Sequence, residues 1–217
     1  MRSYSEKSET DLNMNYLDKC TFCRLNEGVV EACEEFECTH SQEIHNFFKS
    51  EFVEYEREML GKSYCFVTDT TSQDLVCAFT VANSSIRLDL LPKRRRNKIN
   101  RSIPNPKRNR QYQAVLVGQL AVFDKFRGLG IGKEILDFIK GWFKHDTNKT
   151  GCRYIVVDAV NTPKVIKYYL DNGFELMFSS DKEELEYYRK EKQDIPQKEK
   201  FCKTRLMFFE LMNLNAT

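Results

Sequence analysis

A short glycine-rich segment between an apolar strand and an amphipathic helix constrains this chain more than any other feature. The segment is Arg127-Gly128-Leu129-Gly130-Ile131-Gly132. An apolar stretch predicts a strand over residues 113–123 before it, and helical periodicity predicts a helix over residues 130–144 after it. Glycines allow a tight turn and let a ligand approach the backbone closely. The N–H groups at the start of that helix favour an anion, so the segment predicts a pyrophosphate site.

The spacing of the glycines excludes two common phosphate-binding motifs. The order G-x-G-x-G, with a displaced acidic residue, does not fit a dinucleotide fingerprint. A P-loop would need glycine at Arg127 and serine or threonine at Glu134. The remaining pattern is Arg127-x-x-Gly130-x-Gly132, whose alternative interpretation is a tight turn without a ligand.

Other patterns predict the remaining elements. Apolar residues at helical spacing predict an amphipathic helix over residues 41–60, ended by Gly61. Residues 63–68 and 75–83 read as a hairpin, and residues 154–160 as a strand buried on both faces. Thr162 and Pro163 suit the start of a helix that Gly173 ends. Two last strands are predicted over residues 174–179 and 204–211.

Two charged segments interrupt this pattern within the 217 residues, a length that suits one domain. We predict a mobile tail over residues 1–15 and one domain over residues 16–217. Residues 92–110 form an exposed basic connection with no acidic side chain, and residues 181–203 a charged, solvated excursion with a helical turn or two. The formal net charge is only +2, so attraction to nucleic acid would come from this local clustering. The basic connection is either a solvated loop or a track for RNA phosphates, beside which Tyr112 could stack on a base.

The eight cysteines bear on compartment and metal content. Neither a signal-peptide pattern nor a membrane-spanning run is present in the sequence, so we expect a cytoplasmic chain with reduced thiols and no membrane partner. Cys20 and Cys23, with Cys33 and Cys38, suggest half of a zinc site. The second pair is spaced too widely for the usual pattern, so we favour ordinary thiols and expect no metal.

The glycine segment, with its flanks, resembles the GNAT superfamily of N-acetyltransferases. The family's signature, Q/R-x-x-G-x-G/A, is matched by Arg127, Gly130 and Gly132, and the resemblance covers roughly residues 35–211. It implies an α/β (α+β) fold, with a twisted, mostly antiparallel mixed sheet splayed at the fourth strand near Val122 and helices on both faces. It also implies acetyl-CoA as co-substrate. Further matching runs are Gln119-Leu120-Ala121-Val122, Val157-Asp158-Ala159 and Lys167-Tyr168-Tyr169-Leu170-Asp171-Asn172-Gly173-Phe174.

Within that superfamily the pattern is most similar to the toxin acetyltransferases of toxin-antitoxin pairs, which modify aminoacyl-tRNA. That likeness implies aminoacyl-tRNA as the acceptor and an antitoxin protein as partner. The chain departs from those toxins at Gln119, where they usually carry arginine, and in its two charged segments. The similar runs are Phe36-Glu37-Cys38, Tyr64-Cys65-Phe66-Val67, Ser84-Ser85-Ile86-Arg87, Leu91-Pro92 and Val115-Leu116-Val117-Gly118.

The resemblance assigns roles residue by residue. Tyr169 takes the place of the general acid that protonates the departing thiolate, although a packing tyrosine is the alternative. Asn161 would approach the pantetheine arm. The Val122 N–H would polarise the thioester carbonyl. Asp158 is more simply a hydrogen-bonded structural carboxylate than a base, and we assign no general base. The implied cofactor-binding residues are Leu120, Ala121, Val122, Arg127, Gly128, Leu129, Gly130, Ile131, Gly132, Lys133 and Asn161.

The expected activity is direct transfer of acetyl to a primary amine in a ternary complex. Besides aminoacyl-tRNA, the acceptor could be a peptide N-terminus, a polyamine or an antibiotic. The alternative from another class is a non-catalytic coenzyme-binding or RNA-binding module on the same fold. Retention of both the glycine segment and Tyr169 argues against that alternative, because a binder has no need of the acid.

Overall fold

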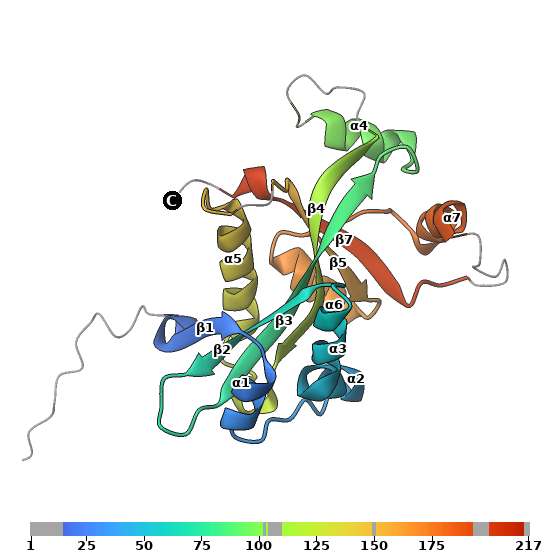
Figure 1. Cartoon of the computed structure of the whole chain (residues 1–217). Helices are drawn as coiled ribbons and strands as arrows, with labels where there is room; N and C mark the ends of the chain where they lie inside the picture. Colours follow the sequence, from blue (N-terminus) through green and yellow to red (C-terminus); the bar gives the residue numbers. More distant parts are fainter. Residues whose placement is uncertain (1–14, 102, 104–109, 149–150, 193–199, 215–217) are drawn as a thin grey trace, which may run out of the picture. The chain divides into compact units, whose positions relative to one another are not determined.

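The computed structural model describes residues 15–101, 103, 110–148, 151–192 and 200–214 (Figure 1). The chain divides into two compact units, each described here by itself. Unit 1 holds residues 1–80 and 119–137, and unit 2 holds residues 81–118 and 138–217. The prediction of one domain over residues 16–217 stays a prediction. Nearly all of the predicted tail lies outside the described residues.

In the part of the chain that the structure describes, seven strands form one sheet, in the order β1-β2-β3-β4-β5-β7-β6. The pair β4 and β5 is parallel, while β1 with β2, β5 with β7 and β6 with β7 are antiparallel. The sheet is therefore mixed, as predicted. The strand bounds are β1 Cys20–Arg24, β2 Lys62–Thr68, β3 Leu75–Arg87, β4 Gln111–Val122, β5 Tyr154–Val160, β6 Glu175–Leu176 and β7 Thr204–Glu210.

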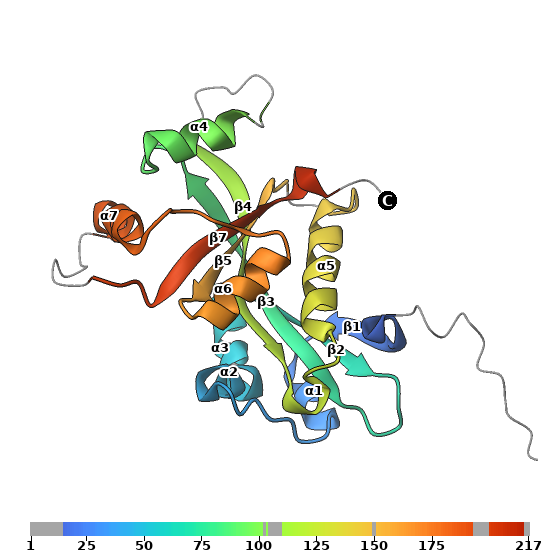
Figure 2. The same ribbon diagram turned by 180° about the vertical axis from the view of Figure 1, so that it is seen from behind.

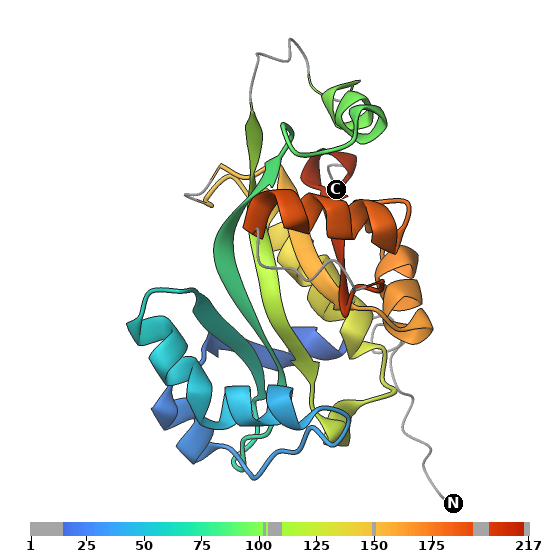
Figure 3. The same ribbon diagram turned by 90° about the vertical axis from the view of Figure 1, so that its right-hand side faces the viewer.

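Helices α2 (Gln42–Asn46), η3 (Phe47–Glu51) and α3 (Phe52–Arg57) of unit 1 follow one another directly and form the helical segment that the sequence predicted over residues 41–60 (cyan in Figure 3). Ser41 caps its start by accepting a hydrogen bond from the Ile44 N–H at 3.3 Å. Phe48 and Phe52 are buried in a cluster with Phe123, which lies just after β4. This core holds the end of β4 in place. Among the described residues, unit 1 also holds the helices η2 (Tyr16–Lys19), α1 (Glu27–Ala32) and η4 (Asp124–Phe126) and the first half of α5 (Ile131–Lys144).

The predicted end of that helical segment at Gly61 is wrong, because Met59 ends it. Met59 has a φ of 56° in the left-handed region. The Leu60 N–H bonds the Tyr55 carbonyl at 3.1 Å, and the Met59 N–H bonds the Glu56 carbonyl at 3.0 Å. These two bonds make a Schellman motif, in which Met59 takes the place usually given to glycine.

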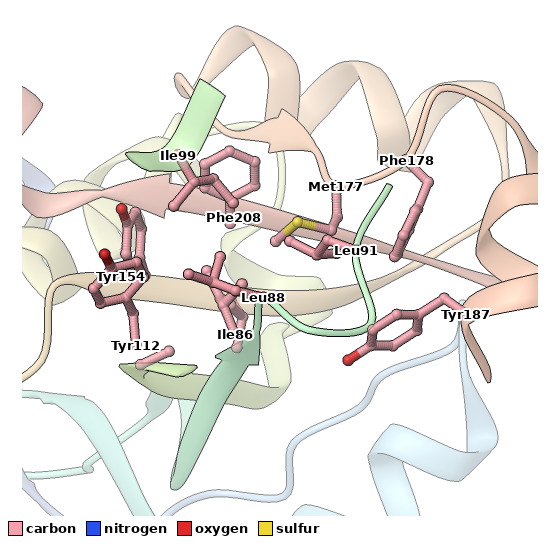
Figure 4. Packing of buried hydrophobic residues seen from close by; sticks show 12 residues of the cluster. Ile86, Leu88, Leu91, Ile99, Tyr112, Tyr154, Met177, Phe178, Tyr187 and Phe208 are labelled. Carbon is pink, nitrogen blue, oxygen red and sulfur yellow. The ribbon is translucent and has the colours of Figure 1, made fainter. Parts of the chain in front are cut away.

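The core of unit 2 lies between β5, β7 and the segments around them, and Figure 4 shows its packing. Tyr154 of β5 and Phe208 of β7 have ring centroids 6.0 Å apart. Figure 2 shows α6 (Pro163–Asp171) against β5. Thr162 caps α6, and Gly173, with a φ of 80°, follows its end, so the predicted bounds are confirmed.

The interpretation of residues 181–203 as a solvated excursion is wrong where the structure describes them. Helix α7 (Asp181–Lys192) buries Leu185 and Tyr187 in unit 2. Glu184 is fully buried and bonds Arg205 of β7. Residues 193–199 of the predicted excursion lie outside the described residues.

The basic connection over residues 92–110 also differs from the prediction, because its first half is helix α4 (Lys93–Arg101) (Figure 1). Ile99 of this helix is buried in the core of unit 2. Residues 102 and 104–109 lie outside the described residues.

The predicted strand over residues 174–179 is limited to β6. Beyond it the Phe178 carbonyl accepts a hydrogen bond at 3.0 Å from the Arg205 side chain. The chain then turns into α7.

Candidate functional site

The glycine segment lies in unit 1 and runs from the end of η4 into the first turn of α5 (Ile131–Lys144). Gly128 and Gly130 have φ angles of 82° and 84°, in the region that other residues rarely adopt. A Cβ at either position would meet nothing within 4 Å. Glycine is therefore needed here for backbone conformation, and the space beside the loop is open.

Helix α5 begins directly at this loop. The Gly130 carbonyl accepts the N–H groups of Lys133 and Glu134 at 2.9 and 3.4 Å, which are the first bonds of the helix. Ile131 is buried and anchors the first turn, whereas Leu129 is half-exposed. The positive end of the α5 dipole thus meets solvent at the glycine segment, an arrangement that suits an anion.

Arg127 is held beside the loop by Asp124, which the sequence analysis did not identify. The Arg127 guanidinium lies 3.4 Å from the Asp124 carboxylate. Asp124 accepts the Thr39 N–H at 2.8 Å. Hydrogen bonds from Thr39, and then the Arg127 charge, hold the pKa of Asp124 below its ordinary value. The i, i+3 spacing across η4 is the local signal that could have indicated this pair.

The other charged residues of the helix entry have partners within unit 1. Lys133 pairs with Asp137 at 2.5 Å, and this pairing raises the pKa of Lys133. Glu134 accepts the Leu17 N–H at 2.9 Å. Lys133 and Glu134 are therefore both engaged by partners within unit 1.

The end of β4 shows the alternation expected of a strand with one buried face. Ala121 is buried in the core of unit 1, while Leu120 and Val122 are partly exposed. The Gln119 N–H bonds the Thr80 hydroxyl at 2.8 Å. The β4–β5 register covers Ala114–Leu116, so it ends well before β4 does.

Tyr169 lies on α6 in unit 2, and its side chain is buried. Its ring packs edge-on against Phe174 and Tyr168, with centroids 5.3 and 5.0 Å away. Burial raises the pKa of the Tyr169 hydroxyl to about 12. The hydroxyl therefore stays protonated at neutral pH and can act only as a proton donor there.

Lys140, which sequence reasoning also missed, holds the end of the helix that carries Tyr169. The Lys140 ammonium donates to the Asn172 carbonyl at 2.9 Å and lies 4.8 Å from the centre of the Phe209 ring. A cation at the C-terminal end of a helix is favourable. Lys140 is buried on an otherwise apolar face of α5, which hides its role in the sequence pattern.

Asn161 follows β5 and is held on several sides within unit 2. Its backbone N–H bonds the Lys203 carbonyl at 2.9 Å. Its side-chain amide donates to the Cys202 carbonyl at 2.8 Å and to the Asp181 carboxylate at 3.2 Å. None of these partners is near in sequence, so no local pattern indicates them.

Strand β5 is not buried on both faces along its whole length, which corrects the prediction. Asp158 and Val160 are exposed, although Tyr154 to Val157 are buried. The Tyr188 hydroxyl donates to Asp158 at 3.4 Å. Asp158 is thus a hydrogen-bonded carboxylate, as its simpler interpretation held.

The basic side chains of helix α4 differ in their ion-pair partners and exposure. Arg95 and Lys98 both pair with Glu175 of β6, at 3.7 Å in the case of Arg95. Lys93, Arg94 and Arg101 are exposed. The idea that Tyr112 stacks on a base is wrong, because Tyr112 is buried and its hydroxyl bonds Asn100 at 3.1 Å.

The cysteines near the N-terminus do not gather at one point. Cys23 faces Cys65 across the β1–β2 pair, with sulfurs 3.5 Å apart. Cys38 lies near His40 instead. Among the described residues, no group of three or more His, Cys, Asp and Glu side chains could hold a metal ion. No described helix has the length and apolar character to cross a membrane.

The predicted site residues thus fall into two groups. The end of β4, Arg127, the glycines and Lys133 all belong to unit 1. Asn161 and Tyr169 lie in unit 2.

Known proteins offer a likeness in structure but not in sequence. No protein-family model matches the chain, and no curated protein sequence matches it. A mutant of KacT gives a TM-score of 0.62 at 16% identity, over 89% of this chain and 96% of that one. AtaT complexed with acetyl-methionyl-tRNAfMet gives 0.61 at 16% identity, over 89% and 95%. AtaTR bound with AcCoA gives 0.60 at 16% identity, over 90% and 95%. The likeness shows that this chain shares the fold of these proteins, which agrees with the mixed α/β architecture predicted from the sequence.

Proposed function

We propose that the chain is an N-acetyltransferase that moves acetyl from acetyl-CoA to a primary amine by direct transfer in a ternary complex. The observation that carries this proposal is the open loop at the start of α5, in which Gly128 and Gly130 take left-handed conformations. Such a loop suits a pyrophosphate at a helix N-terminus. Similar solved structures include one bound with AcCoA, which supports the same co-substrate here.

The residues of the loop fit coenzyme A. Open space beside Gly128 and Gly130 leaves room for phosphate oxygens near the backbone. Arg127, oriented by Asp124, supplies a positive charge on the same segment. The remaining loop residues, Leu129, Ile131, Gly132 and Lys133, complete the helix entry. When bound, acetyl-CoA supplies an acetyl group activated as a thioester.

The transfer forms a C–N bond and breaks the C–S bond of the thioester. The Val122 N–H stabilises the negative charge that develops on the carbonyl oxygen, next to Leu120 and Ala121 on the same strand. The Tyr169 hydroxyl gives its proton to the leaving sulfur. The proton that the amine loses passes to water.

Aminoacyl-tRNA is the acceptor that we favour. AtaT has been solved with acetyl-methionyl-tRNAfMet, and an AtaT mutant toxin with the antitoxin AtaR and acetyl-CoA. By analogy we propose a tRNA partner, an antitoxin partner and a cytoplasmic location, where both tRNA and reduced thiols are found.

The exposed face of α4 is where we place the contact with tRNA phosphates. Arg95 and Lys98 are occupied by Glu175, and Ile99 anchors the helix in the core of unit 2. Lys93, Arg94 and Arg101 remain exposed on the described part of the basic connection. Three such cations on one short helix make a compact phosphate contact.

Replacing Lys93, Arg94 and Arg101 together by glutamine should weaken tRNA binding and make it less sensitive to salt. Each lost phosphate contact lowers the slope of log affinity against log salt by about 0.7 to 0.9, because fewer counterions are released. Filter binding across a salt series measures this slope. Coenzyme binding should not change.

The matched control replaces Lys49, Arg57 and Lys62, three exposed cations of unit 1, with glutamine. This variant has the same net charge but keeps α4, so it should retain the wild-type slope. Equal slopes for both variants would mean that α4 makes no specific contact with tRNA.

The competing function is a non-catalytic module that binds the coenzyme or RNA without turnover. A screen of acetyl transfer to aminoacyl-tRNA, polyamines and peptide amines separates the two. Labelling of aminoacyl-tRNA alone is the expected result. Labelling of another amine would show that this amine, and not aminoacyl-tRNA, is the acceptor. Binding of acetyl-CoA without transfer to any amine would favour the non-catalytic binding module.

A further inference from the structure

Helix α7 holds the side chain of Asn161 in one orientation. The two N–H bonds of the Asn161 amide point to two acceptors, the Cys202 carbonyl at 2.8 Å and the Asp181 carboxylate at 3.2 Å. An asparagine amide has two N–H donors and one oxygen acceptor. With both donors in use, the oxygen is the group that Asn161 can offer to a ligand.

Asp181 is itself fixed by a buried network of charges. The Arg205 guanidinium lies 3.4 Å from Asp181 and 2.6 Å from Glu184. Arg205 also donates to the Phe178 carbonyl at 3.0 Å. Glu184 is fully buried, and burial raises its pKa despite the nearby Arg205 charge. The hydrogen bond from Asn161 and the ion pair with Arg205 thus hold the Asp181 carboxylate from two sides.

This network has no part in the transfer proposed above, yet it ends at a predicted coenzyme contact. It joins α7 to β7 and to Asn161, through residues 161–205 of unit 2 alone. The pair Glu184–Arg205 already joins α7 to β7. The contact of Asp181 with Asn161 is therefore not required to hold α7 against β7.

We infer that Asp181 is a positioning residue for coenzyme binding. It turns the Asn161 amide so that the oxygen, and not the NH₂ group, meets the pantetheine arm and accepts a hydrogen bond from one of its amide N–H groups. The inference rests on the proposed function, since it needs coenzyme A as the ligand. It adds α7 to the elements that shape the coenzyme site.

The test compares two ligands that share the nucleotide but differ in the pantetheine arm. Coenzyme A contains the arm, and adenosine 3′,5′-bisphosphate lacks it. Asp181→Ala should weaken coenzyme A binding roughly 2- to 12-fold, the range for one net hydrogen bond, and leave the bisphosphate unchanged. Asp181→Asn keeps an oxygen acceptor toward Asn161 and should restore much of the affinity. Calorimetry measures all of these affinities.

Glu183→Ala is the matched control, because Glu183 is also an acidic residue in the first turn of α7. It bonds Ser179 and does not contact Asn161, so its loss should not change either affinity. A melting-temperature measurement checks that each variant is folded. If Asp181→Ala does not fold, Asn161→Ala tests the same contact without removing a charge from the network, and it should also weaken coenzyme A alone.

The double variant completes the test. Once Asn161 is alanine, adding Asp181→Ala should cause no further loss of affinity. Equal losses for both ligands, an equal effect of Glu183→Ala, or fully additive effects of the two substitutions would overturn the inference. A wild-type chain that binds neither ligand would instead overturn the proposed function, so the two failures are distinguishable.

Discussion

Replacing Gly130 with glutamate should lower the affinity for acetyl-CoA by about 100-fold or more while the chain still folds. Like charges placed against each other cost several kcal/mol, and each 1.4 kcal/mol is about tenfold in affinity. The new carboxylate would stand at the helix N-terminus where phosphates are proposed to lie. The left-handed φ of 84° adds local strain, but a Cβ at this position meets no atom within 4 Å. Calorimetry with acetyl-CoA measures the loss.

Gly141→Glu provides the matched control, because Gly141 lies on the same helix and is exposed with equally open space. It introduces the same charge away from the loop and should leave the affinity near that of the wild type. Unchanged binding of acetyl-CoA by folded Gly130→Glu would remove the basis of the whole coenzyme assignment.

Replacing Tyr169 with phenylalanine should lower kcat by about 10² to 10⁴ at neutral pH, the usual contribution of a general acid. The loss should fall on kcat because the proton is needed only in the transition state. Phenylalanine keeps the ring that packs against Phe174 and removes only the hydroxyl. Stability and coenzyme affinity should therefore remain near wild type.

The kcat deficit of Tyr169→Phe should change with pH in one direction. Burial raises the pKa of Tyr169 to about 12, so the neutral acid persists as pH rises and is lost only near that value. The leaving thiol ionises near about pH 8.5, so above that pH it departs more easily without help. The deficit of the mutant should shrink as pH rises through this range. A mutant that turns over at the wild-type rate at pH 7 would show that Tyr169 only packs.

The elements set by local sequence were predictable. Thr162, Pro163 and Gly173 bracket α6 because caps act over a few residues, and the structure confirms each of them. The glycine segment was predictable for the same reason, since left-handed φ angles at Gly128 and Gly130 require glycine. Strand β5 also covers the residues for which the run of β-branched side chains predicted a strand.

The elements that depend on distant partners were not predictable. Helix α7 looked solvated because its charged residues hid Leu185 and Tyr187, and Glu184 is buried only because Arg205 of β7 meets it. Strand β1 pairs Cys23 with Cys65, a contact that no local pattern contains. Helix α4 reads as a basic loop unless Ile99 is known to reach the core.

The same division applies to the candidate site. Sequence reasoning proposed the loop and Tyr169 as site residues, and these assignments stay predictions. It missed Asp124, Lys140 and Asp181, which act by holding Arg127, the end of α6 and Asn161. These supporting contacts join segments that are remote in the chain or use residue types common on any surface.

The order in which the chain passes between the two units determines whether the polypeptide can be cut into separate units. Each unit is assembled from two separate stretches, and the boundaries at residues 80, 118 and 137 fall within β3, β4 and α5. No single cut in the gene releases either unit intact, because any cut at a boundary splits a strand or a helix. The loop of unit 1 and the Tyr169 helix of unit 2 are therefore not carried by segments that a single cut separates into intact units. Shuffling of gene segments could exchange neither one alone.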